Sequence, residues 1–314
     1  MKAPFPWFGG KARAASLIWA RLGRVKNYIE PFAGTLAVLL DCPHPADIET
    51  VNDKDRFISN LWRAIQADPD SVAAHADWPV NENDLESRHF WLVSEGAARL
   101  ESLMGTADGY DAKIAGWWLW GQCAWIGSGW CSGEGPWRVG KNGWEMRNAR
   151  QGINRQLPHM GDAGQGVRDY LTEICDRLRR VRVACGDWRR VLTPSVTFRH
   201  GTTGILLDPP YGEGKVDYSI GGNRTSIADD VRQWAIENAE NTELRIALCG
   251  YEGQHEMPGD WTVESWTAAG GYSSTAEEET QGQLNRHRER VWFSPACLPV
   301  EQPFLFSPES AVPA

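Results

Sequence analysis

Apolar positions follow a strand–helix alternation through the first 68 residues. Helical spacing predicts a helix over residues 12–22, with its apolar side chains on one face. The segment "NYIEPFAG" then predicts a buried strand over residues 28–30, and a second helix is expected over residues 35–41. "DIETVND" predicts another short strand and "DRFISNLWRAI" another helix. This order is typical of a parallel α/β sheet.

The alternation stops near residue 68 and returns later in the chain. Helical stretches at 86–104 and 111–126 lead into a Gly- and Trp-rich region without clear periodicity, and a further helix is predicted over 167–181. Strands are predicted at "VRVAC", "GILLDPPY" and "LRIALCG", with a helix over 227–239 before the third of them. "DWTVESWTA" and "ERVWFSP" resemble a closing antiparallel pair.

One α/β domain interrupted by an insertion accounts for this pattern. The predicted catalytic domain comprises residues 1–68 and 166–300, the inserted domain residues 69–165, and the loose C-terminal tail residues 301–314. The chain has no apolar run of about 18 residues, so no membrane span is expected. The N-terminus lacks a secretory apolar region, and seven cysteines without a CxxC pair indicate a cytoplasmic protein with reduced thiols. No metal-ligand pattern is visible.

The net charge of −9 by itself argues against a nucleic-acid partner, but the charge is uneven. Residues 138–190 contain twelve basic and six acidic side chains, an excess of six positive charges. Such an excess suits phosphate binding, and a solvated helix face with cations near its C-terminus explains part of it equally well.

Three predicted strands end in polar residues that would converge at one edge of the sheet. These ends carry Glu30, Asp53 and Asp208, and Gly34 would let the backbone approach a ligand closely. An acid after the second strand is placed to bind ribose hydroxyls. The GxGxxG spacing is absent, which disfavours NAD or ATP and favours a nucleoside-like ligand without phosphates. A plain surface turn is the alternative for the stretch that begins at Asp208.

The motifs "WFGGK", "EPFAG", "ND" and, after a long insertion, "DPPY" together resemble one family. The chain is similar to the Dam-like, D12 class, α-group of S-adenosylmethionine-dependent DNA adenine-N6 methyltransferases, and "RERVWFSP" resembles the last strand of phage-type members. The resemblance implies a Rossmann-like methyltransferase sheet with an inserted, mainly helical target-recognition domain. It covers about residues 1–66 and 182–295, and no single motif carries it alone.

The resemblance also implies roles for particular residues. The catalytic tetrapeptide corresponds to Asp208, Pro209, Pro210 and Tyr211. The cofactor-binding residues correspond to Trp7, Gly9, Gly10, Lys11, Glu30, Pro31, Phe32, Gly34 and Asp53, and less securely to Asp187 and Trp188. Simpler alternatives stay open: a Gly-Gly turn for the first motif, a helix N-cap for Asp53 and an exposed turn for Asp187.

The tetrapeptide has a physical rationale for adenine chemistry. The exocyclic amine of adenine is a weak nucleophile because its lone pair is delocalised into the ring. The Asp208 carboxylate and the Pro209 carbonyl can each accept one hydrogen from that amine and favour the positive charge that develops during attack. Tyr211 offers a ring for stacking, and the target base must flip out of the duplex to reach it. No metal is required.

Tryptophans are concentrated in the insertion. Seven of the 17 lie within 28 residues: Trp117, Trp118, Trp120, Trp125, Trp130, Trp137 and Trp144. Core packing is the expected role of Trp117, Trp120 and Trp125, which share a helix face.

The later tryptophans suggest a nucleic-acid surface. Trp130, Trp137 and Trp144 lie among small residues beside Arg138 and Lys141, and interleaved aromatic and basic groups can stack on bases or insert between them. Core packing is the alternative here too.

The sequence therefore predicts a cytoplasmic enzyme of a bacterium or an infected host cell, a monomer or weak dimer. It would methylate adenine N6 in double-stranded DNA. The alternatives are the same chemistry on cytosine N4 or on RNA adenine, a catalytically inactive DNA-binding homologue, and a protein-amide methyltransferase. Asp208 favours adenine over cytosine, for which serine is common at this position, and over protein amides, for which asparagine is usual.

Overall fold

The computed structural model describes most of the chain. The described residues are 1–7, 9–103, 106, 109–126, 129–132, 135–141, 143–146, 166–210, 226–267 and 287–299. Within these ranges, no helix is both long and apolar enough to cross a membrane.

The main sheet is mostly parallel and has the strand order β5-β2-β1-β6-β7-β9-β8 in the described part of the chain. Its strands are β1 (Asn27–Glu30), β2 (Ile48–Asp53), β5 (Arg182–Cys185), β6 (Thr203–Leu207), β7 (Leu244–Tyr251), β8 (Thr262–Ser265) and β9 (Glu289–Phe293). The first five run parallel, whereas β9 pairs antiparallel with both β7 and β8. The Rossmann-like sheet and its closing antiparallel pair are thus confirmed.

Both faces of the sheet are buried, which explains why its strands are apolar at consecutive positions. Along β6, Leu206 joins one core cluster, and Ile205 and Leu207 join the other. The same alternation divides Tyr28 from Ile29 in β1. The strands therefore have little room for polar side chains except at their ends.

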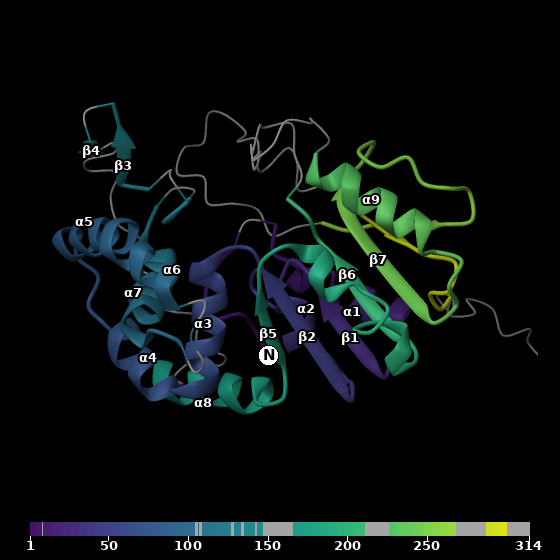
Figure 1. The fold of residues 1–314 in the computed structure, drawn as a ribbon, viewed down its shortest axis with the longest axis horizontal. Coiled ribbons are helices and arrows are strands. Elements are labelled where there is room, and N and C mark those ends of the chain that lie inside the picture. The colour runs from purple at the N-terminus through teal and green to yellow at the C-terminus, as the bar shows by residue number, and fades with distance from the viewer. Residues whose placement is uncertain are drawn as a thin grey trace, which may run out of the picture.

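Helices cover both faces of this sheet (Figure 1). Outside residues 69–165 the described helices are η1 (Lys11–Arg13), α1 (Ala15–Leu22), α2 (Ala37–Leu40), α3 (Arg56–Ala67), α8 (Val167–Leu178), η3 (Trp188–Val191), η4 (Phe198–His200) and α9 (Ile227–Glu237). The predicted helices 12–22, 35–41, 167–181 and 227–239 are confirmed, with shorter bounds.

The insertion packs beside α3 and α8 at one side of the sheet, on the left in Figure 1. Its helices are α4 (Pro69–Ala76), α5 (Glu82–Trp91), the π-helical turn η2 (Leu92–Gly96), α6 (Ala97–Leu103) and α7 (Ala112–Ala124). The helical stretch predicted over 86–104 is confirmed as far as Leu103, and the π-helical turn lies within it, between α5 and α6. A hydrogen bond spans that turn: the indole nitrogen of Trp91 donates to the Glu95 carboxylate at 2.8 Å.

The Gly- and Trp-rich region contains a hairpin that the periodicity missed. Strands β3 (Trp137–Gly140) and β4 (Gly143–Met146) pair antiparallel, and the hairpin lies above α5 in Figure 1. Gly140 and Gly143 are cross-strand partners, and the sequence "GKNG" at this point is a signal for a tight turn. Gly143 adopts a φ of 107°, which side-chain-bearing residues rarely tolerate.

Candidate active site

The candidate site lies where the strand order changes direction. β1 has β2 on one side and β6 on the other, and open α/β sheets bind ligands at the carboxyl ends of strands flanking such a point. Glu30 ends β1, Asp53 ends β2, and Asp208 follows β6 directly. The structure therefore brings these three sequence-predicted acids to one edge of the sheet.

Asn52 and Asp53 brace the loops at this edge. The Asn52 amide donates to the carbonyls of Pro31 at 2.9 Å and Gly186 at 3.1 Å, which ties the loops after β1 and β5 together. Asp53 Oδ2 accepts from the Gly34 amide at 3.0 Å. Asn52 belongs to the "ND" motif, yet the motif predicts no role for it. Its buried position at a strand end is the signal that could have identified it.

Asp55, not Asp53, caps α3. The Asp55 carboxylate accepts from Phe57 N at 2.8 Å, as an N-cap residue does. Asp53 instead accepts from Asp55 N at 2.8 Å, and burial raises the pKa of Asp53 to about 6. The N-cap alternative for Asp53 is thus wrong, and a role for this carboxylate at the site edge stays a prediction.

Gly34 allows a close approach between the β1 loop and the N-terminal motif. Its φ is 47°, and a Cβ added there would lie 3.7 Å from the Trp7 ring nitrogen. The Gly34 carbonyl accepts from the Trp62 indole at 3.0 Å. Trp7 is 39% exposed, so part of its ring remains accessible beside Gly34.

The N-terminal arm, residues 4–7, connects this edge to the insertion. Phe5 is buried and packs edge-on against Trp118 of α7, with ring centroids 5.1 Å apart. Gln122 of α7 donates to the carbonyl of Pro6 at 3.3 Å. The arm that leads to Gly9, Gly10 and Lys11 is therefore held by the inserted domain. Phe8 lies outside the described residues.

Glu30 is a buried acid whose visible contacts are internal. Its side chain is 2% exposed, and Oε1 accepts from the Tyr28 hydroxyl at 2.8 Å and from Leu39 N at 2.9 Å. Burial raises the pKa of Glu30 to about 8, so the carboxyl is largely protonated at neutral pH. These contacts fix the start of α2 against β1, while a direct contact with a cofactor stays a prediction.

Lys11 and Asp208 form an ion pair across the site. Lys11 Nζ lies 2.8 Å from Asp208 Oδ1, and the two side chains are 4% and 23% exposed. Burial raises the pKa of Asp208, and the Lys11 ammonium opposes that rise. Sequence reasoning grouped Lys11 with the cofactor motif and did not foresee this partner. Pro209 is buried and Pro210 exposed, while Tyr211 lies outside the described residues.

Asp187 and Trp188 differ in their surroundings. Asp187 is exposed and caps η3 by accepting from Arg189 N at 2.9 Å, which fits the turn alternative. Trp188 is buried, with its ring centroid 6.1 Å from that of Phe32 in the β1 loop. Phe32 and Trp188 therefore form an apolar wall at the same sheet edge as Asp53.

The β3–β4 hairpin has one apolar and one charged face. Val139 and Trp144 are cross-strand partners and are 70% and 38% exposed. Arg138 and Glu145 face each other on the other side, 3.5 Å apart. Lys141 is exposed at the turn.

The base of the hairpin is anchored in the inserted domain. Trp137 packs on Phe90 with centroids 5.0 Å apart, and its backbone amide donates to His89 Nδ1 at 3.2 Å. Burial lowers the pKa of His89 to about 4, which keeps the imidazole neutral and Nδ1 able to accept. Trp130 is 4% exposed and packs against His89 and Gly121, so it lies in the core rather than on a surface.

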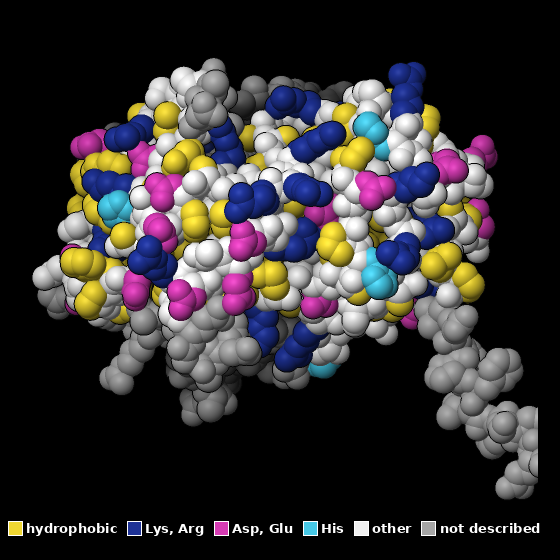
Figure 2. All heavy atoms as spheres, turned by 90° about the horizontal axis from the view of Figure 1, so that it is seen from below, with side chains coloured by type: hydrophobic (Ala, Val, Ile, Leu, Met, Phe, Trp, Pro, Cys, Tyr) yellow, Lys and Arg dark blue, Asp and Glu magenta, His cyan; other side chains and the backbone are white. Residues whose placement is uncertain are grey.

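The positive excess over residues 138–190 is reduced by partners elsewhere in the chain. Arg168 binds Asp70 through two contacts of 2.7 and 2.9 Å, and Arg177 binds Glu49 at 2.7 and 2.8 Å. Arg189 reaches Asp230 at 2.7 Å. Counting charges along the sequence therefore overstated the free positive charge. Figure 2 shows Lys and Arg interspersed with Asp and Glu over the face seen from below.

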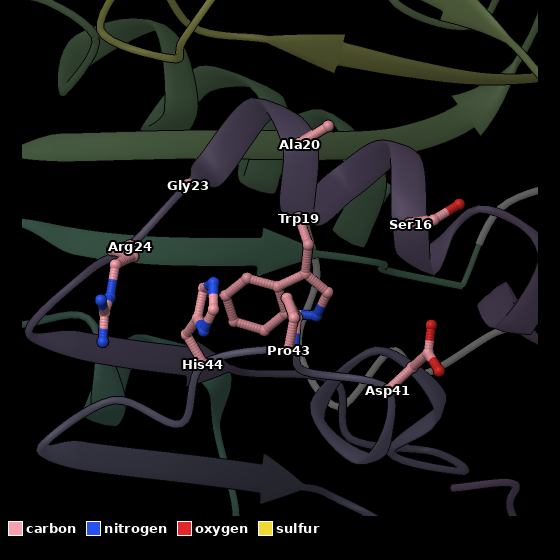
Figure 3. Close-up of a pocket in the computed structure, with 8 residues that line it drawn as sticks. All are labelled: Ser16, Trp19, Ala20, Gly23, Arg24, Asp41, Pro43 and His44. Carbon is pink, nitrogen blue, oxygen red and sulfur yellow. The ribbon is translucent and has the colours of Figure 1, made fainter.

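A separate surface hollow of about 460 Å³ lies near the amino ends of β1 and β2. The Trp19 indole stands at its centre with Arg24, His44 and Asp41 around it (Figure 3). Arg24 precedes β1 and His44 precedes β2, so this hollow is at the opposite ends of those strands from the acids. It is not part of the candidate active site.

The mixed α/β fold with its mostly parallel central sheet is consistent with a Rossmann-like methyltransferase fold. The D12 class N6 adenine-specific DNA methyltransferase family matches residues 7–95, which confirms the predicted resemblance. The match indicates an S-adenosylmethionine-dependent DNA adenine methyltransferase. It includes Lys11, Glu30 and Asp53 but ends before Asp208, whose assignment rests on its sequence motif and position. A comparison with curated proteins finds no match.

The buried state of Glu30 predicts a specific pH dependence of stability. Because its pKa rises from 4.5 in the unfolded chain to about 8 in the fold, its contribution is complete below pH 4.5 and is lost as the pH rises toward 8. We expect Glu30→Gln to remove that part of the loss, about 1.4 kcal/mol for each pH unit in this window. Urea unfolding of both proteins at pH 5.5 and 7.5 measures it; equal losses in the two proteins would show that Glu30 is ionised in the fold.

Proposed function

We propose that this protein transfers a methyl group to N6 of an adenine that has flipped out of double-stranded DNA. The observation that carries the proposal is the Asp208 carboxylate at the carboxyl end of β6, next to β1 and paired with Lys11. A carboxylate in this position can accept a hydrogen from the target amine. The site-specific choice of DNA sequence is assigned to the inserted domain.

The residues at the sheet edge fit S-adenosylmethionine. The φ of Gly34, 47°, favours a residue without a side chain beside Trp7, and the neighbouring Phe32 and Trp188 offer apolar surface for an adenine ring. Asp53 is a carboxylate at the end of β2, the place expected for binding ribose hydroxyls. We assign the cofactor to these residues, with the methionine end toward Gly9 and Gly10.

Asp208 and Pro209 would orient the target amine. Each can accept one N6 hydrogen, through the carboxylate and the backbone carbonyl, and both bonds strengthen as the nitrogen gains positive charge. The neighbouring prolines restrict the loop, which lowers the entropic cost of aligning the amine. Tyr211 is proposed to stack on the flipped base.

The bound S-adenosylmethionine would supply the methyl group as an electrophile with its sulfur as the leaving group, and the target amine would lose one N6 proton. Asp208 is the nearest proposed acceptor for that proton, which then passes to solvent. The chain's remaining contribution is to position the amine and exclude water from the pocket.

The hairpin is the proposed DNA contact. Trp144 and Val139 expose apolar surface beside Lys141 at the turn, so aromatic and basic groups are available in one element. Trp137 and Arg138 support it from the strand, the former on Phe90 and the latter paired with Glu145. Trp130 is left out of this surface because it is buried.

The product identifies the reaction directly. We expect the purified protein to convert unmethylated genomic DNA to DNA containing N6-methyladenine when given S-adenosylmethionine, as measured by mass spectrometry of the digested nucleosides. We expect Asp208→Ala to lower the transfer rate by at least about a hundredfold, because the amine loses its charged acceptor.

Calorimetry provides the control for this variant. Asp208→Ala should keep its affinity for S-adenosylmethionine within about threefold, since less than about 1 kcal/mol of binding depends on the carboxylate. If the product is N4-methylcytosine, the cofactor assignment stands but the proposal that adenine is the target base is wrong. Near-normal turnover of the Asp208→Ala variant would show that Asp208 has no role in methyl transfer.

Asp53 and Asp55 form a matched pair for testing the cofactor assignment. We expect Asp53→Ala to weaken S-adenosylmethionine binding by at least about tenfold, equivalent to about 1.4 kcal/mol, through loss of the ribose contact and the Gly34 brace. Asp55→Ala should instead cost about 1 kcal/mol of folding stability through loss of the α3 cap, with little effect on affinity. Equal affinities of the two variants would contradict the assignment.

The hairpin makes a prediction about salt dependence. We expect Lys141→Ala to reduce the slope of log K against log salt by about 0.9, the value for one lost phosphate contact. Arg138→Ala should change the slope less, because Glu145 already balances its charge. Fluorescence anisotropy with a duplex oligonucleotide measures both, and Arg179→Ala, which alters an exposed ion pair on α8, is the control. Unchanged slopes in both hairpin variants would show that DNA binds to another surface of the protein.

A further inference from the structure

Lys11 is a buried lysine at the junction between the N-terminal motif and the end of β6. Its ammonium lies 2.8 Å from Asp208 Oδ1, donates to the carbonyl of Gly9 at 2.7 Å and lies 5.6 Å from the centroid of the Trp266 ring. Burying an ammonium is costly unless opposite charge and hydrogen bonds compensate. The surroundings of Lys11 supply both, so the fold holds this cation at a fixed place.

We propose that Lys11 is a positioning residue for methyl transfer, which keeps the Asp208 carboxylate charged and fixes its Oδ1 atom. The inference rests on the proposed function, because the charged carboxylate would accept its hydrogen bond from the adenine amine. A carboxylate has two acceptor oxygens, so a contact at Oδ1 leaves Oδ2 to accept from that amine. Lys11 acts through Asp208 and takes no part in the bond changes.

Asp208 needs such a partner because burial favours the neutral acid. It follows the fully buried Leu207 at the end of β6. Burial raises the pKa of Asp208, and Lys11 is the cation that lowers it. A protonated Asp208 would carry a hydroxyl donor and lose acceptor capacity toward the amine.

Lys11 itself remains charged in this setting. Burial lowers the pKa of Lys11, but Asp208, Cys249 and Glu289 raise it, and the net shift is upward. The ammonium is therefore present throughout the pH range in which Asp208 titrates. The N-terminal arm contributes to this geometry, since α7 holds Phe5 and Pro6 a few residues before Lys11.

The charge of Asp208 can be measured without any reaction. The test compares the full-length protein with Lys11→Met, which removes the charge, and Lys11→Arg, which keeps it. The side-chain carboxyl carbon of Asp208 is followed by NMR across pH and identified by its loss in Asp208→Asn. We expect Lys11→Met to raise the titration midpoint by about one to three pH units and Lys11→Arg to stay near the wild type. An unmoved midpoint in Lys11→Met would overturn the proposal.

Activity provides the second readout. Under single-turnover conditions with saturating DNA and S-adenosylmethionine, Lys11→Met should lose at least about tenfold more rate at low pH than at high pH. The reason is that raising the Asp208 midpoint by one pH unit lowers the charged fraction about tenfold on the acid side of the titration. Lys11→Arg should restore the wild-type profile. A uniform loss at every pH, together with weaker cofactor binding in calorimetry, would instead make Lys11 a cofactor ligand only.

The two readouts also separate this inference from the proposed function. Absence of methyl transfer by the wild-type protein would refute the proposed function, whereas the NMR titration would still decide whether Lys11 controls the charge of Asp208. If Lys11→Met does not fold, Lys11→Gln removes the charge while keeping a hydrogen-bond donor and takes its place in both measurements.

Discussion

The central position of β1 between β2 and β6 is the constraint on which the site depends. Parallel pairing aligns Glu30 with Val51 of β2 and Ile29 with Ile205 of β6, so all three strands end at one edge. Both faces of the sheet are buried, and polar groups along the strands would lose their hydration without gaining partners. Chemistry is therefore confined to the strand ends, where the chain leaves the core.

The loops at that edge are held by contacts between segments distant in the sequence. Asn52 links the loops after β1 and β5, and Asp53 holds Gly34. The N-terminal arm is held from the other side by α7, whose Trp118 packs on Phe5. The inserted domain is thus in physical contact with the segment that delivers Lys11. The hairpin is anchored separately, on Phe90 and His89 of α5.

The sequence predicted the sheet and its strand-end acids well, because a parallel sheet requires apolar runs that end in polar residues. It failed where the outcome depends on contacts between distant segments. Trp130 and Trp144 look alike in sequence, yet the first is buried beside His89 and the second is exposed on a hairpin. The local excess of arginines likewise gave no indication that Arg177 pairs with Glu49 and Arg168 with Asp70. Neither difference is encoded in local periodicity or local charge.

Burial raises the pKa of two carboxyl groups at the same edge, Glu30 and Asp208, but their partners differ. Glu30 receives its hydrogen bonds from Tyr28 and Leu39 inside the fold, and burial raises its pKa so that it is largely protonated at neutral pH. Asp208 is more exposed and has the Lys11 ammonium beside it. Glu30 is thus satisfied by neutral donors inside the fold, whereas the proposed role of Asp208 depends on a neighbouring cation. Since the family match contains Lys11 and ends before Asp208, this ion pair physically connects the matched part of the chain with the carboxylate proposed to act in methyl transfer.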